Sequence, residues 1–339
     1  MGHTRHRTAA AALAAAMALT LAACSSDDDS GGDSEGTGGP AATAPGAPGG
    51  AAAPQQTAAA PAPGAVPPAA APGTGSYYVA LGDSYAAGVK IPETVPDSPP
   101  GCSRSGSNYA HLMAKQLAVP TFADATCGGA TTADLAAPQT TLMGGQTPAP
   151  PQFDVLGPET KLVTLGIGGN DIGFGEIMTT CVMRSGDKTS PTPCKNAFTK
   201  DGQDVLKQRI DATGPKIDAA LKTIHDKAPQ ARILVVGYPA ILPESGTGCP
   251  AQLPVAVGDL DYLRGVIRDL NGMISARAAA GNATYVDTYT PGIGHDVCQP
   301  VGVKWVEGIA PESPGAQAHP NALGHEGMAV AVIAKARQV

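Results

Sequence analysis

The chain has 339 residues, with 22 basic and 29 acidic side chains and a formal net charge of −7. It contains four Phe and one Trp, and its Lys and Arg residues form no cluster. Nucleic-acid binding needs positive charge against phosphates and aromatic rings against unpaired bases. This composition therefore argues against a nucleic-acid partner.

The N-terminal residues predict an export signal. Arg5 and Arg7 precede an apolar run over residues 9–21, which is short for a bilayer span. The run ends in Leu21-Ala22-Ala23-Cys24, which resembles a bacterial lipobox. Cleavage before Cys24 would remove residues 1–23 and leave a lipidated cysteine as membrane anchor. The alternative is plain secretion, and both place the protein outside the cytoplasm.

The next segment, residues 24–75, consists almost entirely of Ala, Pro, Gly, Thr, Ser and a few acidic residues. Such a composition cannot bury enough apolar surface to offset the entropy lost on ordering. We therefore expect a disordered tether here. Residues 76–339 are then the folded part, which is long enough for one domain with a sizeable core.

Strand and helix patterns alternate through the folded part. Strands are predicted at 77–81, 120–125, 161–165, 231–236 and 284–286. Helices are predicted at 107–117, at 131–135, at 173–183, at 204–227, at 260–274 and at 322–337, the first of them capped by a Ser. Five strand–helix units predict an α/β fold, in which helices cover both faces of a parallel sheet.

Three polar motifs follow the first three predicted strands. Ser84 ends Gly82-Asp83-Ser84, and Gly129 and Asn170 follow the second and third strands. Ligands of parallel α/β sheets bind beyond the carboxyl ends of the strands, so these residues should meet at one edge. A serine on a tight turn there has the exposed hydroxyl and neighbouring N–H groups that a nucleophile needs. Gly-Asp-Ser also forms ordinary turns, so this interpretation depends on a partner base.

A histidine would be that base. His111 and His225 lie inside predicted helices, and His325 lies within the closing helix. His295 sits in a loop beside Cys298. His319 lies on a loop that runs through Pro320 into the closing helix, which places it best to reach the strand edge.

These residues resemble the sequence blocks of the GDSL, or SGNH, hydrolases, in the family's order. The matching stretches are Gly82-Asp83-Ser84, the segment around Gly129, Gly168-Gly169-Asn170-Asp171 and the segment at His319. The resemblance implies a flavodoxin-like α/β/α sandwich of three layers with a five-stranded parallel sheet. It also implies Ser84 as nucleophile and His319 as base. The oxyanion hole would comprise the backbone N–H groups of Ser84 and Gly129 and the Asn170 amide.

Setting Cys24 aside leaves six cysteines, and an even number in an exported chain indicates three disulfides. Of the many possible pairings, the one between nearest neighbours in sequence gives Cys102–Cys127, Cys181–Cys194 and Cys249–Cys298. None of the six lies in a zinc-ligand pattern. The layout resembles the secreted, three-disulfide actinobacterial lipases and esterases of the family, as does Lys304-Trp305-Val306-Glu307.

One position departs from the family pattern. An Asp usually stands three residues before the histidine, but here the residue is Ala316. Either a main-chain carbonyl near Ala316 orients the imidazole, or Glu312 supplies the acid. We expect a Ser84–His319 dyad held by a carbonyl.

The resemblance implies an extracytoplasmic lipase or carboxylesterase that acts on a small-molecule or lipid ester. A carbohydrate O-deacetylase or a phospholipase could use the same residues. From another class, a surface lipoprotein could bind ligands without catalysis, although the joint presence of Ser84, Asn170 and His319 favours an enzyme. We expect a monomer that requires neither a metal nor a cofactor.

Overall fold

The structure is a computed structural model that describes residues 77–140 and 148–338. The predicted signal peptide, the predicted tether and Cys24 lie outside the described residues. Within the described ranges, no helix combines the length and the apolar character that a membrane span requires.

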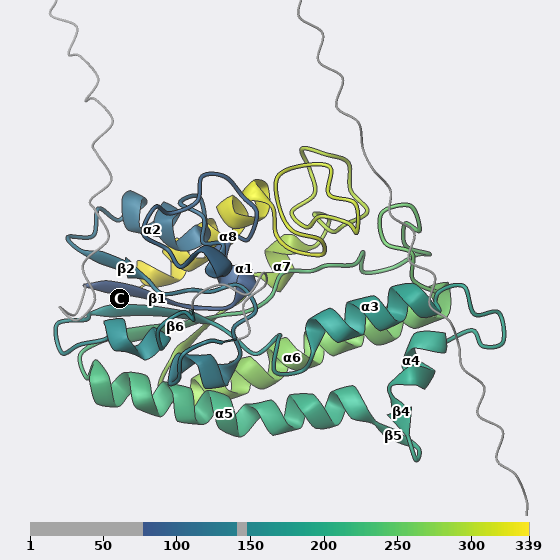
Figure 1. The fold of residues 1–339 in the computed structure, drawn as a ribbon, viewed down its shortest axis with the longest axis horizontal. Helices are drawn as coiled ribbons and strands as arrows, with labels where there is room; N and C mark the ends of the chain where they lie inside the picture. Colours follow the sequence, from purple (N-terminus) through teal and green to yellow (C-terminus); the bar gives the residue numbers. More distant parts are fainter. Residues whose placement is uncertain (1–76, 141–147, 339) are drawn as a thin grey trace, which may run out of the picture. The chain divides into compact units, whose positions relative to one another are not determined.

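A parallel sheet of five strands forms the centre of the domain (Figure 1). Its strands, in spatial order, are β2 (Phe122–Asp124), β1 (Tyr78–Gly82), β3 (Leu162–Gly166), β6 (Arg232–Val236) and β7 (Thr284–Val286). Tyr78 pairs with Phe122 on one side and with Leu162 on the other. β2 lies on one side of β1, and the later strands β3, β6 and β7 lie on its other side. Ligands of such folds bind where the order of the strands reverses in this way, which here is between β1 and β3. The predicted parallel α/β sheet is confirmed.

Helices cover both faces of this sheet. In Figure 1, α2 (Tyr109–Gln116) and α8 (Ala322–Ala336) lie on one side, and α5 (Val205–Lys227) and α6 (Leu260–Ala280) lie on the other. Alternate residues of β1 explain the two layers: Tyr78 and Ala80 pack with α2 and α8, whereas Val79 and Leu81 join the larger core with α5 and α6. The strands are buried on both faces, as parallel strands usually are.

Shorter elements complete the chain. The helices are α1 (Ser84–Ala87), α3 (Phe174–Arg184), α4 (Pro193–Ala197) and α7 (Tyr289–Gly292). The 3₁₀ turns are Pro100–Cys102, Thr132–Leu135, Gln152–Val155 and Val257–Asp259. A small antiparallel pair joins β4 (Thr199–Lys200) to β5 (Gln203–Asp204).

Capping residues set where the helices begin. Asp204 accepts hydrogen bonds from the backbone N–H groups of Leu206 and Lys207, so α5 begins where the sequence predicts. The predicted Ser cap of α2 is wrong. Asn108 is the cap, because its side-chain oxygen reaches the backbone N–H of His111 at 3.0 Å, and α2 begins at Tyr109, two residues after the predicted start. The predicted helix at 131–135 is a 3₁₀ turn.

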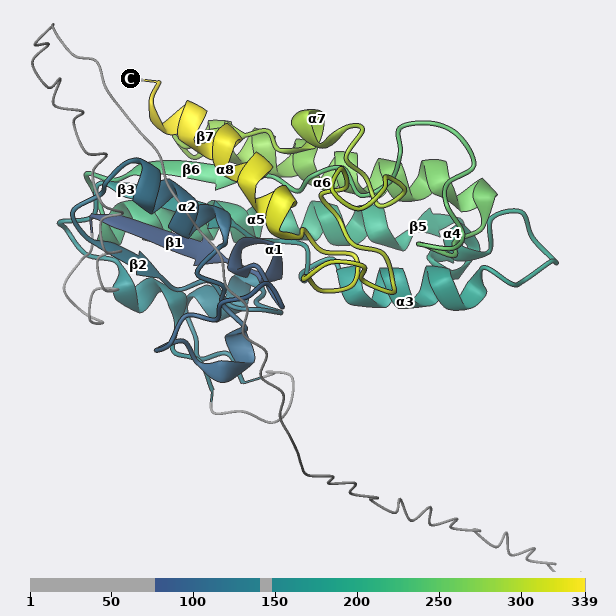
Figure 2. The ribbon, with the colours of Figure 1, turned by 90° about the horizontal axis from the view of Figure 1, so that it is seen from above.

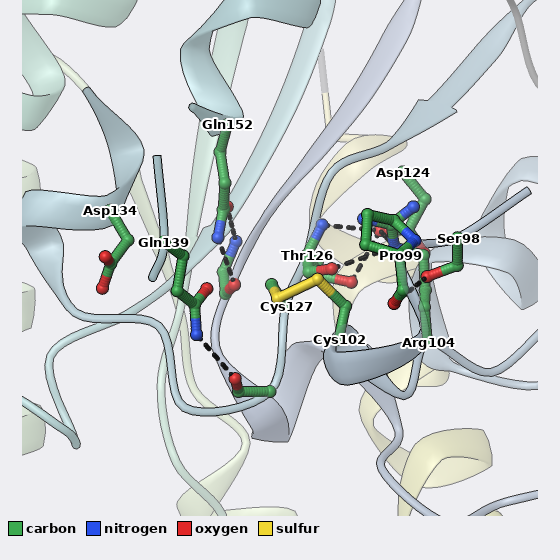
Figure 3. The surroundings of a disulfide bond; sticks show 12 residues. Ser98, Pro99, Cys102, Arg104, Asp124, Thr126, Cys127, Asp134, Gln139 and Gln152 are labelled. Carbon is green, nitrogen blue, oxygen red and sulfur yellow. Dashed lines mark hydrogen bonds and ion pairs between the residues drawn. A yellow bond between two sulfur atoms is a disulfide. The ribbon is translucent and has the colours of Figure 1, made fainter. Parts of the chain in front are cut away.

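Three disulfides crosslink the domain, and they join Cys102 to Cys127, Cys181 to Cys194 and Cys249 to Cys298. The first ties the segment before α2 to the loop that follows β2 (Figure 3). Gly128 lies in that loop, and its carbonyl accepts a hydrogen bond from the Gln139 amide at 2.8 Å. The bridge therefore anchors the segment that carries Gly129.

Candidate active site

Ser84 is placed by the turn between β1 and α1. Gly82 occupies φ +154°, and a Cβ there would lie 2.5 Å from the Gly166 carbonyl oxygen, so the close approach of β1 and β3 requires glycine. The Gln152 side chain pairs with both backbone polar groups of Gly82, at 2.7 and 2.9 Å (Figure 3). Asp83 caps α1 by accepting from the Tyr85 N–H at 2.9 Å. The serine hydroxyl therefore projects from a fixed backbone.

Asp83 is a buried carboxyl that holds this turn. Burial raises the pKa of Asp83 to about 7, although the Tyr238 hydroxyl opposes the shift by donating to Oδ2 at 2.6 Å. The same hydroxyl accepts from the Gly169 N–H at 2.7 Å. Tyr238 thus links the turn that carries Ser84 to the loop that carries Asn170.

His319 contacts the serine directly. Its Nε2 lies 2.8 Å from Ser84 Oγ, and its Nδ1 lies 2.6 Å from the Gln317 carbonyl oxygen. With the proton on Nδ1, donated to that carbonyl, Nε2 is free to accept from the serine. Burial lowers the pKa of His319, and the positive charge of Lys90 lowers it further, while the Gln317 carbonyl opposes both.

Among residues 77–140 and 148–338, no carboxylate lies at His319 Nδ1. The Glu312 carboxylate lies 2.6 Å from Lys304 Nζ instead. Ala316, at the position where the family usually has Asp, is buried against Ala87 and Val89. An ionised side chain at that position would be buried among apolar groups, which is costly.

The loop that carries His319 is held by main-chain pairing. The Glu307 N–H donates to the His319 carbonyl, and the Ala318 N–H donates to the Glu307 carbonyl, both at 3.0 Å. The Tyr85 hydroxyl donates to the Ala318 carbonyl. Its ring also lies 4.7 Å from the imidazole, centroid to centroid. Tyr85, the residue after Ser84, therefore holds Ala318, the residue before His319.

Behind this loop lies a buried ion pair. Lys304 Nζ and Glu307 Oε2 are 2.9 Å apart, and both side chains are fully shielded from solvent. Burial alone would raise the pKa of Glu307. Hydrogen bonds from Asn321, Ser313, the Glu312 backbone and Lys304 outweigh burial and hold it at about 2. Asn321 also caps α8, so the network ties the histidine loop to the closing helix.

Two further predicted residues lie in the loops beside Ser84. Asn170 lines the pocket at Ser84, and its amide donates to the Ala130 carbonyl at 2.9 Å. The Asp171 carboxylate accepts from the Thr132 N–H and hydroxyl at 2.9 and 2.6 Å. These contacts join the loops after β2 and β3. Gly129 adopts φ +78° between them, a conformation that favours glycine.

Comparison with known proteins identifies the family. The profile of the GDSL-like lipase/acylhydrolase family matches residues 80–326, which include all four motifs. The chain belongs to this family. The resemblance drawn from the sequence is therefore confirmed, and the protein is a hydrolase of the carboxylic ester class.

Relatives in this GDSL family come from Streptomyces. Lipase 2 of Streptomyces coelicolor is 38% identical over 259 residues, which are 74% of this chain and 83% of the relative. An esterase of Streptomyces scabiei is 30% identical over 306 residues, which are 80% of this chain and 88% of the esterase.

Two solved structures share the fold. Phospholipase A1 from Streptomyces albidoflavus has 29% identity and a TM-score of 0.61, covering 78% of this chain and 100% of that one. An extracellular lipase from Streptomyces rimosus has 26% identity and a TM-score of 0.61, covering 76% and 98%.

The remaining histidines of this GDSL-family domain have other contacts. His325 is buried in α8, where burial lowers its pKa to about 3 and Nδ1 accepts from the Tyr109 N–H. His295 stacks on Trp305, with ring centroids 4.6 Å apart. His225 contacts the Gly281 carbonyl at 2.9 Å. His111 Nε2 lies 3.3 Å from an Asp124 carboxylate oxygen.

Proposed function

We propose that this protein is an extracytoplasmic serine ester hydrolase that cleaves acyl esters with a Ser84–His319 dyad. The observation that carries the proposal is the 2.8 Å contact between Ser84 Oγ and His319 Nε2 beyond the carboxyl end of β1. Membership in the lipase/acylhydrolase family supports the chemistry.

In the first half-reaction, Ser84 Oγ attacks the ester carbonyl carbon while His319 Nε2 takes the hydroxyl proton. The Ser84 and Gly129 N–H groups and the Asn170 amide stabilise the oxyanion, and each donor contributes roughly 3 kcal/mol to the lower barrier. The tetrahedral intermediate collapses, and the imidazolium returns its proton to the departing alcohol. Water then attacks the acyl-serine with the same base, releasing the carboxylic acid and restoring Ser84.

The Gln317 carbonyl replaces the acid of a triad in this scheme. As an acceptor from Nδ1 it keeps the imidazole in the tautomer that leaves Nε2 free. A neutral carbonyl stabilises the imidazolium less than a carboxylate does. This is consistent with the lowered pKa of His319.

Lipid esters are the proposed substrates, because the relatives include lipases and an esterase. A phospholipase is the second candidate, supported by the 29% identity to phospholipase A1. The disulfides and the extracellular relative support an extracytoplasmic location. We also propose lipidation of Cys24 after removal of residues 1–23. A native protein whose N-terminus lies beyond Cys24 in mass spectrometry would exclude this anchor.

A p-nitrophenyl ester chain-length series on the mature protein, with Ser84→Ala as control, tests the function. We expect hydrolysis by the wild type and a loss of about 10⁶-fold in kcat for Ser84→Ala, as serine nucleophiles show. A fluorophosphonate probe should add its mass to Ser84 alone. Labelling that persists in Ser84→Ala would contradict the nucleophile, and preferential release of acetate from acetylated xylan would favour the deacetylase.

A further inference from the structure

A groove of about 410 Å³ runs along α3 and ends at His319. One wall is a face of α3 from Phe174 to Met183, and the other consists of Ile309 and residues 317–319. The α3 members recur at helical spacing, so they form one continuous stripe. At 1.5 Å per residue this stripe is about 13 Å long.

The groove is apolar and open. Its lining includes the apolar side chains of Phe174, Met178, Val182, Met183 and Ile309. The Met183 side chain at its outer end is 78% exposed, and methionine adapts readily to apolar ligands. An apolar stripe that leads to a polar reactive group matches an amphiphilic ligand with an aliphatic chain.

A second pocket shares Phe174 with the groove. It is lined by Ser84, Asn170, Ile241, Ile267 and Leu270 among others, and is narrower than the groove. The Phe174 ring packs edge-on against Tyr85 and His319, with centroid distances of 5.7 and 6.4 Å. Phe174 therefore lines both compartments, one of which includes Ser84 while the other reaches His319, its hydrogen-bonded partner.

The position of the histidine indicates which part of the ester lies in which compartment. His319 must deliver its proton to the departing oxygen, so the alcohol portion of the ester lies on the His319 side. The oxyanion donor Asn170 lies on the other side. We propose that the α3 groove binds an aliphatic chain carried by the alcohol portion of the ester. This inference rests on the proposed function, and it specifies esters such as acylglycerols, whose leaving group carries a second chain.

The expected selectivity follows from the hydrophobic effect. Full burial of one methylene group raises affinity roughly fourfold, and we expect contact with one wall of an open groove to raise it roughly twofold. Octyl acetate has four more methylene groups than butyl acetate in its alcohol. We expect kcat/KM to be roughly tenfold higher for octyl acetate.

Gly175 offers a clean way to block the groove. A Cβ at Gly175 would meet no atom within 4 Å, so Gly175→Leu starts from open space, adds apolar volume at the groove and favours the helix. Gly272 in α6 has the same open surroundings, which makes Gly272→Leu the matched control. The ratio of kcat/KM for octyl acetate to that for butyl acetate is measured for each enzyme separately, so that a general loss of activity cancels. It should fall towards one in Gly175→Leu and persist in Gly272→Leu.

Met183→Ser shortens the apolar stripe at its outer end and should lower the same ratio by a smaller factor. A wild-type ratio near one, or an unchanged ratio in Gly175→Leu, would overturn the proposal. The proposal would also be overturned if Gly175→Leu lowered the ratio of kcat/KM for p-nitrophenyl octanoate to that for p-nitrophenyl butyrate but kept the octyl acetate to butyl acetate ratio. That result would place the acyl chain in the groove. The failure of the proposed function looks different: p-nitrophenyl acetate would then be hydrolysed equally by wild type and Ser84→Ala.

Discussion

Ser84 and His319 reach the same point from two regions that are built differently. The serine follows an interior strand that is hydrogen-bonded on both sides, and it is fixed by a tight turn. The histidine lies on an irregular loop, which is fixed by main-chain pairing with Glu307 and by the buried Lys304–Glu307 ion pair. The serine thus depends on the sheet and on a short capped turn, whereas the histidine depends on a loop that is supported by a buried ion pair. The two halves should respond to different perturbations.

The largest effect is expected from breaking the ion pair. Lys304→Met leaves the Glu307 carboxylate buried without its cation, and such losses cost about 3–5 kcal/mol. Urea unfolding measures this loss, and the rate at which a fluorophosphonate labels Ser84 reports the displacement of His319. Adding Glu307→Gln should restore part of the stability, because the uncompensated charge is removed.

The matched control is Lys207→Met, which removes an exposed ion pair with Asp211 in α5. Exposed pairs contribute up to about 1 kcal/mol. Equal losses for the two lysine variants would show that the Lys304 pair has no special role.

A smaller effect is expected where the two halves touch. Tyr85→Phe removes the hydroxyl that donates to the Ala318 carbonyl and leaves a buried acceptor unpaired, at a cost of about 1–3 kcal/mol. Since this bond holds the histidine loop against the serine turn, kcat should fall roughly tenfold while KM changes little. Tyr262→Phe, which removes a remote bond to Asp204, is the control and should keep kcat. An unaltered kcat in Tyr85→Phe would show that this hydrogen bond does not position the histidine loop against the serine turn.

The pH profile of kcat/KM probes the histidine. The proposed base His319 acts when neutral, and burial lowers its pKa below the ordinary 6.5. The acid limb of kcat/KM should therefore have its midpoint below pH 6.5. Lys90→Gln removes a positive charge that lowers this pKa, so the midpoint should move up slightly, and less so at high salt. A midpoint above 6.5 would mean that the imidazolium has an anionic partner.

The smallest effect is expected for Glu312→Gln. Its carboxylate contacts Lys304, not His319, so kcat/KM should stay within a fewfold of wild type in steady-state assays. A loss approaching ~10⁴-fold, as when a triad acid is neutralised, would make Glu312 the third member.

The same contrast explains what the sequence could predict. The apolar run before Gly82-Asp83-Ser84 and the repeated strand–helix pattern are local signals, and they located the sheet, the serine and the loop of Asn170. The absence of Asp at position 316 suggested a main-chain carbonyl at the histidine, but not that it belongs to Gln317, because a main-chain atom leaves no trace in residue type. Tyr85 and Tyr238 form bonds to residues 233 and 155 positions away, which periodicity cannot reveal. The fully buried Lys304 and Glu307 run against the usual exposure of charged residues, so their role as a buried support was missed.

The carbonyl at Nδ1 has a genetic consequence. A triad acid can be lost by a single codon change, but the acceptor at Gln317 belongs to the peptide backbone and is encoded by almost any residue there. The Gln317 side chain lines the α3 groove, and its amide donates to the Ile309 carbonyl. A substitution at position 317 therefore alters the groove, whereas the main-chain acceptor at the histidine is inherited unchanged.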